Sequence, residues 1–154
     1  MNEIDFDGKI FINDKNINEI SKETINSKFA YISQNVYLIN GTIQDNINLF
    51  NIESFDNDII NDILGFPNPD FYLGNSELDK ISGGERKRIA FGRLLRCIES
   101  KDVILIDETF ANLDKENSKK IADSIIDKIN EKILIVVSHD DFVKNIFRTD
   151  QTEY

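Results

Sequence analysis

The stretch Ile81-Ser82-Gly83-Gly84-Glu85, followed downstream by Val103-Ile104-Leu105-Ile106-Asp107-Glu108, is the most specific structural signal in this chain. The first segment places glycines at the start of a helix, where backbone N–H groups approach an anion and the helix dipole favours it. The second segment is an apolar run that ends in two carboxylates. One of them can bind Mg²⁺ while the other orients or deprotonates a water. Together the two segments predict a site for nucleotide hydrolysis.

Composition narrows the class of protein. The 154 residues, 40% of them hydrophobic, are enough for one core and predict one domain or part of one. No window reaches the roughly 18 consecutive apolar residues of a membrane span, and residues 1–5 lack the character of a signal peptide. We therefore expect a cytoplasmic chain without direct membrane insertion.

Charge and cysteine content exclude further classes. Lys and Arg total 18 against 28 Asp and Glu, and the net charge of −10 disfavours nucleic acid as a partner, since residues 86–88 are the only basic cluster. The single cysteine, Cys97, excludes an internal disulfide and is expected to be a small core residue.

The first half of the chain is expected to contain short elements. Residues 9–13 lie between turn residues and predict a short strand, and residues 29–32 predict a second one. Residues 40–80 carry three glycines and both prolines, and they are expected to form short helices broken by loops.

The second half is expected to alternate strand and helix. Residues 82–99 follow the spacing of one apolar helix face. The runs 103–106 and 133–137 are unbroken and apolar, which is typical of parallel strands covered on both faces. The apolar stripe of the helix between them is expected at Ala122, Ile125, Ile126 and Ile129, and a last helix is expected at Phe142, Val143, Ile146 and Phe147.

Each motif also has an explanation that needs no ligand. Ser82 and Glu85 fit a capping box, which a helix can form with no anion nearby. Asp107-Glu108 could be turn residues, Asp114 is a plausible N-cap, and His139 could be a loop histidine. However, the strand before His139 delivers it to the carboxyl edge of the sheet, where open α/β sheets bind ligands. The joint order of the motifs favours the functional interpretation.

In this order the motifs resemble those of ATP-binding cassette (ABC) ATPases. Residues 7–14 resemble the antiparallel strand after the phosphate-loop region, and residues 31–34 resemble the strand leading into the Q-loop. Residues 36–43, with 45–47, are similar to the stretch after the Q-loop in ABC exporters. The resemblance implies an α/β fold, a partial P-loop NTPase with a helical subdomain and a parallel-sheet C-terminal half.

The resemblance also implies three regions within a partial ABC ATPase domain spanning residues 1–154. Residues 1–40 would form the strands of the β-subdomain and the Q-loop, and residues 41–80 the helical subdomain. Residues 81–154 would contain the signature helix, the Walker B strand, the D-loop and the switch histidine.

Site roles, cofactors and partners follow from the same resemblance. It implies Asp107 as the Walker B ligand of Mg²⁺, Gln34 as a contact to Mg²⁺ or water, Glu108 as the general base, and His139 as the switch histidine, with Asp114 in the D-loop. It implies ATP and Mg²⁺ as cofactors, an ABC transmembrane domain and a second ABC ATPase domain as partners, and a peripheral position at the inner face of the cell membrane. The signature residues implied to contact ATP held by the second subunit are Ser82, Gly83, Gly84 and Glu85.

The family's phosphate loop, Walker A, has no match in the sequence. No Gly-x-x-x-x-Gly-Lys-Ser/Thr occurs; the only Gly-Lys pair is Gly8-Lys9, with Glu3 where the first glycine should be. We therefore expect a fragment, whether engineered, split or a remnant, that is inactive in isolation. A phosphate-loop strand and helix normally fill the middle of this core, so their loss is expected to leave apolar surface uncovered.

Two functions remain open at this point. The chain is either an ATP-hydrolysing fragment of an ABC exporter, which powers transport when a Walker A segment completes it, or a non-catalytic module that pairs with a complete ABC ATPase domain.

Overall fold

The computed structural model describes residues 7–49, 56, 58–78 and 80–148. In chain order the elements are β1 (Phe11–Ile12), β2 (Lys15–Asn16), η1 (Ile17–Glu19), α1 (Lys22–Lys28), β3 (Phe29–Ile32), β4 (Gly41–Thr42), α2 (Ile43–Asn48), η2 (Ile59–Ile63), β5 (Tyr72–Leu73), α3 (Asn75–Leu78), α4 (Gly83–Cys97), η3 (Ile98–Ser100), β6 (Val103–Asp107), α5 (Lys115–Ile126), β7 (Ile133–Val137) and α6 (Asp141–Ile146). None of the helices in these stretches is long and apolar enough to cross a membrane.

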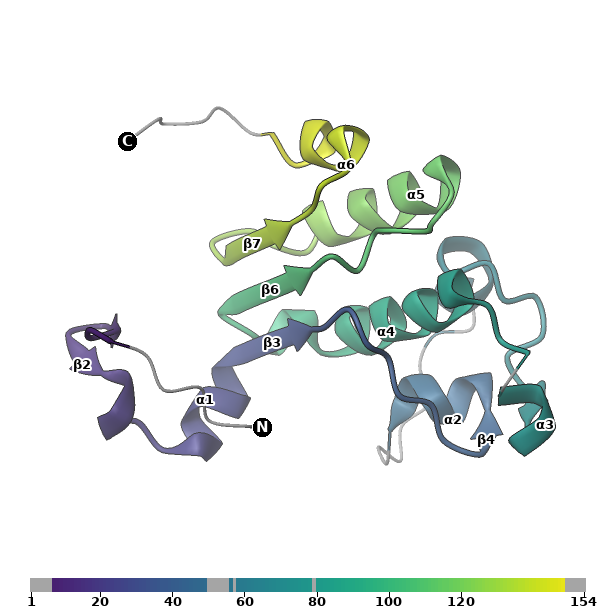
Figure 1. The fold of residues 1–154 in the computed structure, drawn as a ribbon, viewed down its shortest axis with the longest axis horizontal. Helices are drawn as coiled ribbons and strands as arrows, with labels where there is room; N and C mark the ends of the chain where they lie inside the picture. Colours follow the sequence, from purple (N-terminus) through teal and green to yellow (C-terminus); the bar gives the residue numbers. More distant parts are fainter. Residues whose placement is uncertain (1–6, 50–55, 57, 79, 149–154) are drawn as a thin grey trace.

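The centre of the described structure is a parallel sheet of three strands in the order β3, β6, β7 (Figure 1). Val103 pairs with Phe29 on one side and with Ile133 on the other. Parallel pairing places the carboxyl ends of all three strands at one edge of the sheet. The strands predicted at 29–32, 103–106 and 133–137 are confirmed.

One face of this sheet is buried and the other is exposed. Side chains alternate along the strands, so Ile104 and Ile106 point into the core beneath α4 and α5, with exposed fractions of 0% and 1%. On the other face Tyr31, Ile133 and Ile135 are 50%, 59% and 50% exposed. The expectation that the apolar runs are covered on both faces is therefore wrong, because within the described residues both helices contribute to one core.

The expected uncovered apolar surface is confirmed, but its position differs from the one expected. β6 pairs with both β3 and β7, so the middle of the described sheet has no room for another strand. The surface lies instead on the face opposite α4 and α5, with Val137 at the end of β7 also 49% exposed.

α4 organises the core. A capping box starts it: the Ser82 hydroxyl accepts from the backbone N–H of Glu85, and the Glu85 carboxylate accepts from the N–H of Ser82. Its apolar stripe is buried as expected, and Gly92 permits a close approach, because a Cβ there would lie 2.8 Å from Leu64 Cδ1. Cys97 packs partly buried against the core, and burial raises the pKa of its thiol.

α5 follows the predicted pattern only in part. Ile126 is 37% exposed and ends the helix, and Ile129 packs against the core from beyond it. The buried stripe runs instead through Ser118, Ile121, Ala122 and Ile125. The last predicted helix is confirmed as α6.

The first half is more turned than the sequence predicts. In place of one strand over 9–13, β1 and β2 form a hairpin whose turn residues Asn13 and Asp14 have φ values of 47° and 64°. Two positive φ values in a two-residue loop match the twist of a hairpin, and Asn and Asp tolerate them. In region 41–80 the expected short helices are present, together with an unpredicted two-stranded pair of β4 and β5. The division at 40 and 80 into subdomains stays a prediction.

Candidate functional site

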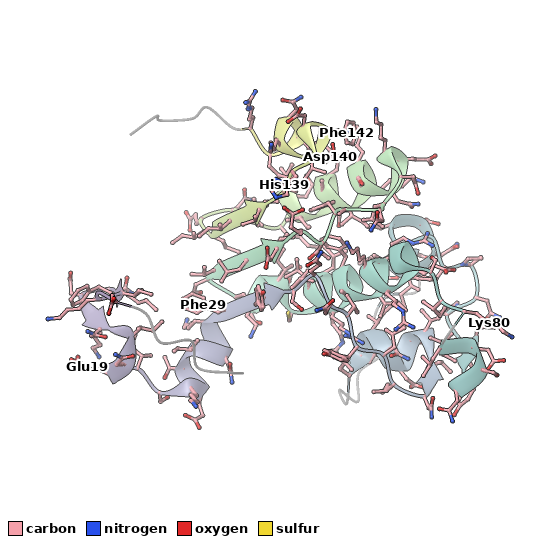
Figure 2. The ribbon with its side chains drawn as sticks, in the orientation of Figure 1. Glu19, Phe29, Lys80, His139, Asp140 and Phe142 are labelled. Atoms are coloured by element: carbon pink, nitrogen blue, oxygen red, sulfur yellow. The ribbon has the colours of Figure 1, made fainter. Side chains whose placement is uncertain are left out.

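The carboxyl edge of the sheet gathers the predicted hydrolytic residues. β6 ends at Asp107 and is followed by Glu108, while His139 lies just beyond β7 (Figure 2). His139 Nε2 is 3.3 Å from Glu108 Oε1, and the Tyr31 hydroxyl donates to Asp107 Oδ2 at 3.2 Å. The strand end thus directs the two neighbouring carboxylates to different partners, Asp107 toward β3 and Glu108 toward the loop after β7.

Glu108 is held in an unusual backbone conformation. Its φ is 49°, in the left-handed region, and its N–H donates to the carbonyl of Val137 at 3.0 Å, which continues the pairing of β6 with β7. Its side chain is 20% exposed, whereas that of His139 is 94% exposed.

The carboxylate of Glu108 has acceptor capacity to spare. Oε1 is buried and accepts no hydrogen bond from the described residues; the contact with His139 is close enough for an ion pair but does not have hydrogen-bond geometry. A buried acceptor without a donor calls for an explanation, and a bound water supplies one. This arrangement can orient a water and take its proton.

The edge suits a magnesium ion that keeps waters and phosphate oxygens as most of its ligands. Within the described residues no three His, Cys, Asp or Glu side chains cluster as a metal cage. Mg²⁺ commonly binds through one or two carboxylates plus substrate phosphates, and Asp107 can supply such a ligand. Gln34 lies two residues beyond β3 at the same edge and is exposed, but among the described residues no hydrogen bond joins it to Asp107.

The second predicted site lies at the start of α4. At Gly83 an added Cβ would meet none of the described residues within 4 Å. The cavity there has a volume of about 430 Å³ and its lining includes none of Asp107, Glu108 and His139. It is lined by Ser82, Gly83, Gly84, Glu85, Arg88, Asn112, Leu113 and Asp114. The structure therefore brings the signature residues together with the predicted D-loop, but apart from the hydrolytic residues.

Two of the explanations that need no ligand, the capping box and the Asp114 N-cap, are realised in this cavity. The Ser82 hydroxyl and backbone N–H hold the pKa of Glu85 below its ordinary value, as expected for the carboxylate of a capping box. Asp114 is the N-cap of α5: it accepts from the Asn117 N–H at 2.9 Å, and this bond and the Asn117 side chain lower its pKa. These contacts shape the rim of the cavity whether or not an anion binds there.

Sequence reasoning missed Lys87, which joins the two sites. Its side chain is buried, and Nζ donates to the carbonyls of Glu108 at 3.1 Å and of Ala111 at 2.7 Å. Burial lowers its pKa, and the charge of Glu108 opposes that shift. A signal was present, because Lys87 lies four residues before Phe91 and so extends the apolar stripe of α4.

Two further residues at the edge were also missed. The buried hydroxyl of Thr109 lies 3.0 Å from the carbonyl oxygen of Asp107 and 3.4 Å from that of Ile32, so it links the ends of β6 and β3. Tyr31 lies on the exposed face of the sheet, but its partial burial and the neighbouring Asp107 raise the pKa of its hydroxyl. Nothing in the local sequence marks either residue as part of a site.

The basic cluster at 86–88 does not form one charged patch. Arg86 donates to the Leu78 carbonyl, Lys87 is buried as described, and the Arg88 guanidinium lies 4.9 Å from the centre of the Phe66 ring. The three cations are thus used in three directions within the fold.

The fold and these motifs define the parallel-sheet half of an α/β domain with a glycine-led helix beside a carboxylate strand. A model of the family described as ABC transporter matches residues 2–111. The chain therefore belongs to the ABC transporter family, and the resemblance found in the sequence is confirmed.

Relatives support this membership. The chain is 30% identical over 142 residues to the Microcin-J25 export ATP-binding/permease protein of Escherichia coli, a match that covers 86% of this chain and 24% of that protein. It is 31% identical over 142 residues to ATP-binding cassette sub-family B member 6 of Rattus norvegicus, covering 86% of this chain and 17% of the relative. The chain thus spans a quarter or less of the length of these relatives.

A solved structure has the same fold. A bacterial Atm1-family ABC exporter with ATP bound matches with a TM-score of 0.73 and 22% identity, over 90% of this chain and 26% of that one. The predicted partial ABC ATPase fold is confirmed.

Proposed function

We propose that this chain is part of the ATP-binding domain of an ABC exporter and that it hydrolyses ATP when a Walker A segment completes it. One observation carries the proposal: Asp107 and Glu108, adjacent at the end of a parallel strand, face different partners, and a buried oxygen of Glu108 accepts no hydrogen bond from the part of the chain that the structure describes. Such a division of two carboxylates serves a metal and a water at once.

Each residue at the edge then has a distinct role. Asp107, with Gln34 at the same edge, would hold Mg²⁺, which would supply positive charge to the phosphates. Glu108 orients the attacking water and accepts its proton. His139, beside Glu108 and exposed, donates a hydrogen bond to a phosphate oxygen. ATP supplies the phosphoanhydride bond that is broken, and the protein contributes position and charge.

The separate signature cavity supports action in trans. Ser82, Gly83, Gly84 and Glu85 line a cavity that excludes the hydrolytic residues of the same chain, so a nucleotide bound there belongs to another copy or domain. The start of α4 offers backbone N–H groups and a positive dipole end to its phosphates. The partner is therefore a second ABC ATPase domain in a dimer.

The uncovered sheet face supports completion by another segment. Ile133, Ile135 and Val137 expose apolar side chains along β7, which is an edge strand of the described sheet. Parallel sheets in α/β proteins are covered on both faces, so a strand and helix that carry the phosphate loop have a place to bind there.

The remaining partners follow from the family. We propose a transmembrane ABC domain as the membrane partner, which would hold this chain at the inner face of the cell membrane. The bacterial relative is named an export ATP-binding/permease protein and the matching structure is an ABC exporter, which supports this assignment.

A second candidate function is a non-catalytic module that pairs with a complete ABC ATPase domain. The observation that favours it is the signature cavity, whose lining comes entirely from this chain and needs no phosphate loop. In that case Ser82 and the glycines contribute a surface for the partner's nucleotide, and Glu108 has no catalytic role.

Substitution of Glu108 in a domain restored with a phosphate-loop strand and helix tests the proposal. Glu108→Gln is expected to bind ATP as the unsubstituted domain does but to lose about 10²–10⁴ in steady-state turnover, as for removal of a general base. Asp107→Asn is expected instead to raise the Mg²⁺ concentration needed for half-maximal activity, because it removes a charged ligand.

Glu116→Gln, an exposed glutamate in the first turn of α5, is the matched control and should leave turnover unchanged. Turnover that is equally unchanged in Glu108→Gln would return Asp107-Glu108 to the status of turn residues and favour the non-catalytic module.

A further inference from the structure

We propose that Lys87 is a positioning residue that fastens the turn carrying Glu108 to the signature helix, so that a change at the start of this helix alters the stability of the turn that holds the hydrolytic carboxylate. The meaning given to Glu108 rests on the proposed function. The mechanical link itself needs no nucleotide.

Lys87 binds the turn formed by residues 108–112 through two backbone carbonyls. Its Nζ donates to the carbonyls of Glu108 at 3.1 Å and Ala111 at 2.7 Å, and its side chain is only 6% exposed. The N–H of Ala111 donates to the carbonyl oxygen of Glu108 at 3.3 Å, so the two carbonyls belong to the first and last residues of one hydrogen-bonded turn. Removing this buried ammonium would lower stability, because each of the two backbone carbonyls would lose a hydrogen bond.

The turn needs such support because its backbone is unfavourable. Glu108 and Asn112 have φ values of 49° and 67°, in the left-handed region that residues with a Cβ rarely adopt. Such conformations persist when surrounding contacts over-determine them. One of the carbonyls bound by Lys87 belongs to Glu108 itself, and the other belongs to Ala111, the residue before Asn112. The lysine therefore fixes the segment where the strain occurs.

A second contact joins the same turn to the same helix. A Cβ on Gly84 would lie 3.1 Å from the carbonyl oxygen of Asn112, so the helix backbone and the turn are already in close contact. Gly84 and Lys87 are three residues apart on α4 and therefore share a face. One face of the first turns of α4 thus contacts residues 108, 111 and 112.

Lys87 differs from the rest of its stripe in a way that packing does not require. Phe91, Leu94 and Leu95, which continue the same face, are apolar and buried. A methionine would fill most of the space of the lysine stem but could not donate to the two carbonyls. The hydrogen bonds, and not the volume, are therefore the property that the site uses.

Amide hydrogen exchange of the chain 1–154, followed by NMR, tests the link. In Lys87→Met the N–H groups of Ala111 and Leu113 are expected to exchange at least about tenfold faster, while Ile121 in α5 keeps its rate. Lys87→Gln keeps two N–H donors on a shorter side chain and should give rates between those of the wild type and Lys87→Met. The matched control, Lys119→Met on the exposed side of α5, should leave all these rates unchanged.

A double-mutant cycle separates coupling from simple local stability. Ser82→Ala removes the cap of α4 and is expected to speed exchange at Ala111 and Leu113 by about threefold in the wild type, but to add no further change in the Lys87→Met background. An equal factor in both backgrounds, or an unchanged rate at Ala111 in Lys87→Met, would overturn the proposal.

A measurement on the wild type covers the case in which Lys87→Met does not fold. The Lys87 ammonium is expected to give an NMR signal with slow proton exchange, since it is buried and hydrogen-bonded, and loss of that signal to fast exchange would overturn the proposal. These readouts use no ATP, so a failure of the restored domain to hydrolyse ATP leaves them unaffected.

Discussion

The two adjacent signature glycines are expected to respond in opposite directions to alanine. Gly83 and Gly84 occupy the first turn of α4, and neither has a positive φ that would exclude a Cβ. A Cβ on Gly83 would meet no atom of the described part of the chain within 4 Å, whereas one on Gly84 lies 3.1 Å from the carbonyl oxygen of Asn112 and 3.8 Å from Leu113 Cδ2. Gly83→Ala therefore serves as the matched control for Gly84→Ala.

The magnitude follows from the difference between the two sites. Replacing a helical glycine by alanine stabilises by roughly 0.5–1 kcal/mol, and this term is similar for both. Only Gly84→Ala adds the cost of overpacking, about 1–3 kcal/mol, because a backbone carbonyl in a turn cannot rotate away as a side chain can. We expect the free energy of unfolding of Gly84→Ala to be about 1–3 kcal/mol lower than that of Gly83→Ala.

Urea denaturation followed by circular dichroism measures this difference, provided that the two variants have the same dependence of free energy on denaturant. For a chain of this size the difference corresponds to about 2–4 °C in melting temperature per kcal/mol. Two variants that agree within about 0.3 kcal/mol would show that the turn yields freely, and would refute the view that α4 and residues 108–112 are packed as one unit.

Two further properties can be tested on the same chain. The Ser82 hydroxyl holds the pKa of Glu85 below its ordinary 4.5, so the capping box stabilises the folded chain fully above that pH and less as the pH falls through the folded pKa. Glu85→Ala should therefore lower the free energy of unfolding by about 0.5–2 kcal/mol at pH 7 but have little effect near pH 2, as measured by urea titrations at both pH values. The exposed apolar face should make the chain self-associate, and Ile135→Lys should shift its sedimentation toward the monomer relative to a control, Lys119→Met; a wild type that is monomeric at all concentrations would contradict this.

Local signals predicted much of the fold and of the candidate site. The capping box depends only on Ser82 and Glu85, which are three residues apart, so its helix begins where the sequence predicts. The apolar runs that became β6 and β7 have few alternatives, and parallel pairing then brings the residues after them to one edge. This is why Glu108 and His139, which follow two neighbouring strands, lie in contact at that edge.

Other features depend on contacts between distant residues. Both faces of β7 are apolar, so its alternation gives no hint that Ile133 and Ile135 are exposed while Leu134 is partly covered. The partners of Lys87 lie 21 and 24 residues away, and no local pattern specifies carbonyl acceptors. The two-residue strands β4 and β5 are too short for periodicity to reveal them.

The order of strands in the sheet also bears on where this chain can accept inserted residues. β3 pairs with β6 across roughly 70 residues, and closing such a loop costs only about 0.6 kcal/mol more for each doubling of its length. Because β3 pairs directly with β6, residues added to the loops of region 41–80 would leave the strand ends next to Gln34 and Asp107 in register. The helices of that region have less freedom, since Ile47 and Leu64 pack against Gly92 of α4.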